Sequence, residues 1–165
     1  MSSDTFTTAM FLITAIAAAA VLINAVFPVI YTMTGTFTSS SHEADTRLRT
    51  DVKIINTYAN SSRIAQVWLK NVGSYRVSAN EINQSDVFIG SPGDFTVVPL
   101  RLTSIGSNGW TFEILDDTND YWESGETLQI TIACPKIPVN TGDPVYFQFV
   151  TQSGIARSVE FTSSG

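Results

Sequence analysis

The hydrophobic and polar positions divide the chain into an apolar head and a mixed body. From Ala9 to Tyr31 the sequence is almost continuously apolar. A helix of this length rises roughly 35 Å, more than the roughly 30 Å of a bilayer core. A Ser/Thr-rich stretch and then charged residues follow up to Arg49, and Pro28 is expected to kink the helix. The pattern therefore predicts a long N-terminal hydrophobic helix over residues 1–50.

Three interpretations of the apolar segment compete. A cleaved secretory signal has a basic start and an apolar core of about 7–15 residues, whereas this segment is longer and has no basic residue before it. A single-span membrane anchor fits the length, but no Lys or Arg lies close enough to set its orientation. The third is a helix that ends buried among copies of itself. The run Ala17–Ala20 favours it, because small residues let helices approach closely.

Residues 51–165 show the short alternating runs that are typical of β-strands. Turn signals such as Gly73-Ser74 separate the runs, and no helical pattern is found among them. The expected strands are residues 52–57, 64–71, 86–90, 95–105, 110–115, 127–135, 144–154 and 156–162. We therefore predict an α+β chain in which the long N-terminal hydrophobic α-helix is followed by an antiparallel β-sandwich domain. A barrel-like domain is the alternative.

Composition narrows the range of functions. The net charge of −6 argues against nucleic acid as a partner. The chain has one cysteine, Cys134, and one histidine, His42, which leave no internal disulfide and little basis for zinc or His-dependent chemistry. Cys134 has apolar neighbours and is expected to be a small buried side chain. We find no nucleophile elbow and no glycine-rich phosphate loop, so an enzyme is not expected.

One acidic stretch is the candidate metal site. Residues 115–126 read LDDTNDYWESGE and offer oxygen ligands at alternating positions, which is the donor type that calcium binds. The spacing is not that of an EF-hand, since Tyr121 stands where the loop glycine is expected. A solvated acidic turn is the alternative interpretation. No cofactor is required, and calcium is the candidate ligand of Asp116, Asp117, Asn119, Asp120 and Glu123.

Two N-x-[ST] sequons offer candidate N-glycosylation sites. They begin at Asn60 and Asn83, and both are expected in turns, where a glycan would be exposed.

Three stretches together resemble the archaeal flagellin (archaellin) family. The stretch AMFLITAIAAAAVLINAVF, residues 9–27, is similar to a type IV pilin-like assembly helix. Residues 50–74, TDVKIINTYANSSRIAQVWLKNVGS, resemble the point where that helix gives way to the first β-hairpin. Residues 115–130, LDDTNDYWESGETLQI, are similar to an acidic turn ending in Gly-Glu in related archaeal surface proteins.

The resemblance implies an assembly helix over residues 1–50 and an outer, Ig-like or archaellin-like β-sandwich over residues 51–165. It implies a structural subunit of a helical extracellular filament, the archaellum, for swimming motility and surface adhesion. The expected partners are identical subunits in a helical polymer, the membrane before assembly, and the archaellum motor and platform proteins. The side chains expected to pack in the polymer are Met10, Phe11, Leu12, Ile13, Ala17, Ala18, Val21, Leu22, Val26 and Phe27.

The same layout also resembles the stator-type accessory proteins of the archaellum, in particular at VWLKNVGS and DVFIG. A membrane-anchored β-sandwich binding module is a further alternative. The sequence departs from the family's precursor pattern, because no Lys, Arg or Gly precedes Ser2. Either the numbering begins at the mature N-terminus or the basic leader is absent. Thr5 stands where bacterial pilins carry a glutamate, which weakens only the bacterial pilin interpretation.

Overall fold

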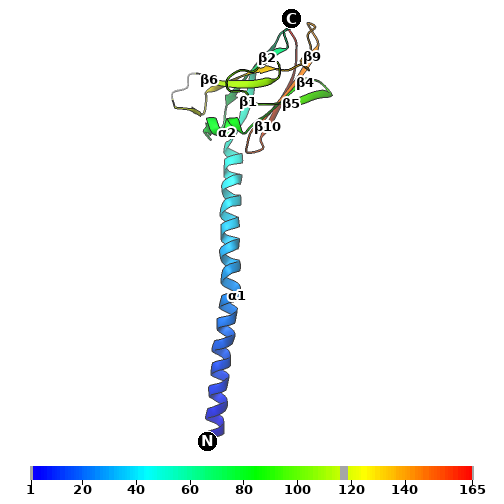
Figure 1. Ribbon diagram of the computed structural model, residues 1–165. Coiled ribbons are helices and arrows are strands. Elements are labelled where there is room, and N and C mark those ends of the chain that lie inside the picture. The colour runs from blue at the N-terminus through cyan, green and yellow to red at the C-terminus, as the bar shows by residue number, and fades with distance from the viewer. Residues whose placement is uncertain (1, 116–118, 165) are drawn as a thin grey trace. The chain divides into compact units, whose positions relative to one another are not determined.

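The long N-terminal helix is present, and it is the longest element of the chain. The computed structural model describes residues 2–115 and 119–164. Helix α1 spans Ser2–Arg49 (Figure 1, blue to cyan). Helix α1 continues through Pro28, although proline has no N–H with which to continue the backbone ladder, and the kink expected there stays a prediction. The chain divides into two compact units, Met1–Ala44 and Asp45–Gly165, so the last turn of α1 belongs to the second unit.

The second unit is built on two four-stranded antiparallel sheets. The first has the order β1-β2-β8-β6 and the second the order β10-β9-β4-β5. A two-stranded sheet pairs β3 with β7. The strands of the first sheet are β1 (Val52–Ala59), β2 (Ile64–Asn71), β6 (Gly109–Leu115) and β8 (Thr127–Ala133). Those of the second are β4 (Asp86–Ser91), β5 (Asp94–Val98), β9 (Pro144–Val150) and β10 (Ala156–Thr162). The short pair consists of β3 (Val77–Ser78) and β7 (Tyr121–Trp122).

Side chains from both large sheets form one hydrophobic core, which makes the domain a β-sandwich. Burial alternates along β2 and β9, as expected for strands with one face on a core. The largest fully buried side chains include Trp110, Trp122, Phe147 and Phe149. Cys134 is buried with them, which confirms the prediction for this residue. The predicted fold class is therefore confirmed.

Three local predictions for the body were wrong. A short helix, α2 (Ala79–Asn83), interrupts the strands, where no helix was expected. The strand predicted over residues 95–105 ends at Val98, because Pro99 cannot donate a hydrogen bond to a neighbouring strand. In β1 the register shifts between Ile54 and Asn56, which breaks the expected regular alternation: Val52 and Ile54 are the less exposed positions before the shift, and Thr57 and Ala59 after it.

The unexpected helix has a local cause in the sequence. Ser78 is its N-cap: the Ser78 hydroxyl accepts a hydrogen bond from the Glu81 N–H at 3.3 Å. In return, the Glu81 carboxylate accepts from the Ser78 N–H at 2.8 Å. This reciprocal capping box satisfies N–H groups that a short helix otherwise leaves unpaired. The S-x-x-E spacing was thus a readable signal for α2.

Candidate assembly helix and candidate ligand sites

The candidate assembly helix exposes its apolar surface in all directions. The ten residues predicted to pack in a polymer are all exposed. Residues 10–13 are four consecutive apolar side chains, and successive helical residues point about 100° apart, so apolar surface surrounds the axis. Phe11 is 72% exposed and Val21 70% exposed. A helix with this surface requires an apolar environment on every side, either lipid or other helices.

Length and charge agree with such an environment. Within the part of the chain that the structure describes, α1 is a helix long and apolar enough to cross a membrane. Its charged side chains lie near the ends, with Asp4 in the first turn and Arg47 and Arg49 in the last. These charges complement the helix dipole and leave the apolar segment between them uncharged.

Eight hydroxyl groups of α1 donate to carbonyl groups of the same helix. Thr14 Oγ1 donates to the carbonyl of Met10 at 2.8 Å, and Thr32 Oγ1 donates to the carbonyl of Pro28 at 2.8 Å. The same bond to the fourth preceding carbonyl is made by Thr7, Thr8, Thr34, Thr36, Thr38 and Ser39. Because each of these hydroxyls has its partner on its own helix, burial in apolar surroundings leaves none of them unpaired.

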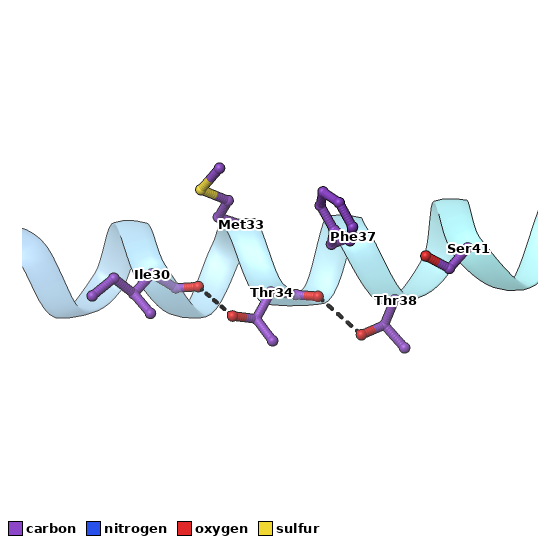
Figure 2. Close-up of a pocket in the computed structure, with 6 residues that line it drawn as sticks. All are labelled: Ile30, Met33, Thr34, Phe37, Thr38 and Ser41. Atoms are coloured by element: carbon purple, nitrogen blue, oxygen red, sulfur yellow. Dashed lines mark hydrogen bonds between the residues drawn. The ribbon is translucent and has the colours of Figure 1, made fainter.

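A shallow hollow lies on one side of α1, beyond the residues predicted to pack. Figure 2 shows Met33 and Phe37 projecting on one side of the helix, with the Thr34 and Thr38 hydroxyls turned back to the backbone. Met33 is 67% exposed and Phe37 71% exposed. The lining residues are Ile30, Met33, Thr34, Phe37, Thr38 and Ser41. Their spacing of three and four residues is that of the ridges and grooves along which helices pack.

This surface was missed in the sequence because the stretch after Tyr31 reads as polar. Alternating threonines conceal Met33 and Phe37, which are four residues apart and therefore share a face. The hydrogen bonds of the threonines to their own helix make the stretch less polar than its composition indicates.

The two candidate glycosylation sites lie in different surroundings. Asn60 lies in the turn between β1 and β2, and its Oδ1 accepts from the N–H groups of Ser62 at 3.0 Å and Ile64 at 3.1 Å. Asn83, expected in a turn, is instead the last residue of α2. Its Oδ1 is buried, and Ser85 of its sequon is buried and donates to the Glu81 carbonyl at 3.0 Å. Asn60 is the more accessible sequon.

The candidate calcium site is described only in part. Asp116 and Asp117 lie outside the described residues. Asn119 Nδ2 donates to Glu123 Oε1 at 3.2 Å, and Asn119 Oδ1 accepts from the Tyr121 N–H at 3.1 Å. In the ranges that the structure describes, no group of three or more His, Cys, Asp or Glu side chains is placed to hold a metal ion. Calcium binding at this turn therefore stays a prediction.

The capping box of α2 has a perturbed electrostatic environment. Burial by itself would raise the pKa of Glu81, but hydrogen bonds from the Ser78 N–H, the Ser78 hydroxyl and the Tyr75 hydroxyl outweigh it and hold that pKa below its ordinary value. The hydrogen bond to Glu81, together with burial, raises the pKa of Tyr75. Ser78 and Glu81 form the capping box of α2, and this network therefore has a structural role.

Comparison with known proteins gives one family and two informative structures. The family model described as archaeal-type flagellin matches residues 3–161. A protein of Archaeoglobus fulgidus described as uncharacterized is 27% identical over 167 residues, covering 98% of this chain and 99% of that protein. The archaeal flagellum of Methanospirillum hungatei is similar with a TM-score of 0.68 and 16% identity, over 95% of this chain and 92% of that one.

The second structure is the archaellum periplasmic stator protein FlaG from Sulfolobus acidocaldarius. It has a TM-score of 0.56 and 26% identity, and the match covers 68% of this chain and 99% of FlaG. Both archaellum resemblances noted in the sequence are thus confirmed. The flagellin match spans nearly the whole chain, which identifies a structural archaellum component and not an enzyme. The chain belongs to the archaeal-type flagellin family.

Proposed function

We propose that this chain is the repeating structural subunit of an archaellum filament and that it polymerises through α1. The observation that carries the proposal is the exposure of apolar surface all around α1, over a length that exceeds a membrane span. A single-span anchor needs lipid around about 20 residues, whereas here exposed apolar side chains continue to Phe37. Neighbouring copies of α1 would cover the part of this surface that lipid does not.

In this proposal the membrane holds the subunit before assembly. Lipid tails and neighbouring helices are similarly apolar, so transfer from one to the other gains little from the hydrophobic effect. Close packing of small residues such as Ala17 and Ala18 supplies the difference, since short side chains allow helix axes to approach. The self-paired hydroxyls of Thr14 and Thr32 make the transfer easier, because they need no partner in either environment.

The β-sandwich would form the outer part of the filament. Contacts that join different surfaces of successive subunits do not close on themselves and therefore generate a helical polymer. Rotation would come from separate motor and platform proteins. Swimming motility and surface adhesion would follow from the filament as a whole, at the archaeal cell surface.

A stator role is the second candidate function. FlaG, described as an archaellum periplasmic stator protein, shares 26% identity with this chain, which is more than the flagellum of M. hungatei shares. We favour the filament because the flagellum resemblance extends over 95% of this chain and that of FlaG over 68%.

Mechanical shearing of cells separates the candidate functions. A filament subunit is abundant and sediments as polymers after shearing. A stator protein stays in the cell envelope at low copy number, and a solitary anchored module dissolves in detergent as a monomer. Recovery of this chain only in the envelope fraction would reject the filament role.

A further inference from the structure

We propose that the exit of α1 into the β-sandwich is a rigid coupling that fixes the last helical turn to the domain. We call residues 49–52 the exit segment and residues 72–75 the clasp loop. All of them lie in the same compact unit, Asp45–Gly165. Chains often change direction between a helix and a domain through a few loosely held residues that can act as a hinge. Here that connection is held from two sides.

The clasp loop satisfies the carbonyls of the exit segment with its backbone N–H groups. The Arg49 carbonyl accepts from the N–H groups of Ser74 at 2.9 Å and Tyr75 at 3.1 Å. The Asp51 carbonyl accepts from those of Val72 at 2.9 Å and Gly73 at 3.0 Å. These four bonds continue the pairing of β1 with β2 past the end of the ladder at Val52–Asn71. The last carbonyls of a helix have no partner within the helix, so the two bonds to the Arg49 carbonyl hold the end of α1 directly.

The clasp loop is itself held in shape by Asn71, which is 1% exposed. Its Nδ2 donates to the carbonyls of Tyr75 at 2.8 Å and Trp122 at 3.0 Å, and its Oδ1 accepts from the Gly73 N–H at 3.0 Å. Its backbone groups bond to Gly125 and Glu126. A buried side chain whose donors and acceptors are all used fixes the loop in one conformation.

The approach of the two segments leaves no room for a side chain at Gly73. A Cβ atom there would clash with the carbonyl oxygen of Arg49 and the nitrogen of Asp51, which are both backbone atoms. Backbone atoms cannot rotate away as the end of a flexible side chain can. Glycine is therefore required for this contact, and the contact itself is as close as backbone packing allows.

Strand β10 holds the exit segment from the second side. Arg157 Nε donates to the carbonyl of Val52 at 2.9 Å, and Arg157 Nη2 lies 2.6 Å from Asp51 Oδ1. The exit segment leads into β1 of the first sheet, whereas Arg157 lies on β10 of the second, so this pair ties the exit segment to the opposite sheet. Thr50, which is 6% exposed, completes the arrangement by donating its hydroxyl to the Thr46 carbonyl at 2.7 Å. The exit segment is thereby joined to both sheets.

The mechanical meaning of this coupling rests on the proposed filament function: rotation of a helical core would reach the β-sandwich without slack at residues 50–51. The coupling itself is tested on single subunits in detergent micelles, where no filament is needed. A negative result there would reject the coupling and leave the proposed filament function untouched. In the full chain, with Cys134→Ala, spin labels at Leu48→Cys and Glu113→Cys report the distance between the last helical turn and β6. Both positions are exposed.

Pulsed electron paramagnetic resonance should give one narrow distance distribution for this labelled chain. Arg157→Ala should broaden it about two-fold, because one of the two restraints is released. The matched control is Lys136→Ala, which removes another surface ion pair, with Asp94, far from the exit segment in sequence; it should leave the width unchanged. Gly73→Ala should broaden the distribution further, and Arg157→Ala carries the test if that variant does not fold. A broad distribution in the unsubstituted chain, or an unchanged width in Arg157→Ala, would overturn the proposal.

Discussion

Replacement of Ala18 by arginine tests the role of α1 most sharply among single substitutions. Ala18 is exposed in the single chain and lies roughly 14 Å along the axis from Ala9 and roughly 20 Å from Tyr31, the two ends of the apolar segment. An arginine side chain there cannot reach polar surroundings at either end by extending along the helix. The charge would be buried without a partner, whether in lipid or among helices.

The expected cost can be converted into a loss of affinity of the subunit for the filament end. A buried charge without a partner costs about 3–5 kcal/mol. At about 1.4 kcal/mol for each factor of ten, the affinity of the subunit for the filament end falls by roughly two to three and a half orders of magnitude. The same charge costs about 2.5–3.5 kcal/mol at the centre of a bilayer, so the membrane pool of subunits is lowered as well. We expect no filaments.

Ala18→Ser is the matched control. A serine at this position can donate its hydroxyl to the carbonyl of Thr14, as Thr14 does to Met10 at 2.8 Å. It adds a polar group that is paired within the helix, so filaments should form. Negative-stain electron microscopy of sheared material, with membrane fractionation to quantify the inserted precursor, provides the assay. Filaments of normal length and number from Ala18→Arg cells would show that position 18 is not buried in apolar surroundings in the filament.

Three further predictions concern the rest of the chain. Deletion of residues 2–44 removes the exposed apolar surface up to Phe37 and leaves the β-sandwich with its own core, so the product should be a soluble monomer by analytical ultracentrifugation. Filaments of native diameter from this variant would count against a helical core. Intact mass spectrometry should find a glycan lost in Asn60→Gln but not in Asn83→Gln, since the Asn83 sequon is held in α2; the reverse pattern would contradict this. The pKa of Glu81 is lowered in the folded chain, so its carboxylate stabilises the fold above pH 4.5, and this stability is lost as the pH falls through the folded pKa. In a plot of the thermal unfolding midpoint against pH, Glu81→Gln should therefore reduce the decline on the acid side. An unchanged decline would show that the carboxylate has no such role.

The helix and the sandwich could be predicted because each follows from a pattern that covers many residues. A continuous apolar run leaves few alternatives to a helix, and alternating strands such as β2 and β9 leave few alternatives to a two-layer core. Shorter features were decided by single contacts. Helix α2 depends on the pairing of Ser78 with Glu81, and the end of β5 depends on Pro99, so both were misjudged from the longer pattern.

The functional surface could be predicted only in outline. The exposed apolar side chains up to Phe27 follow directly from composition, whereas Met33 and Phe37 were hidden among threonines whose hydrogen bonds the sequence does not reveal. The clasp loop depends on the buried carboxamide of Asn71 and on the absence of a side chain at Gly73. In sequence these two residues read only as a strand end followed by a turn. Contacts between segments that are distant in sequence, such as those of the clasp loop, leave no local pattern in the sequence from which they could be predicted.

An electron cryomicroscopy map of filaments sheared from cells that produce this chain tests the central claim most directly. We predict that the chain can be traced in every subunit of the filament, with residues 9–31 of α1 packed against neighbouring copies at the centre and the β-sandwich of residues 51–165 outside. Filaments built from a different protein, with this chain found only in the cell envelope, would contradict it.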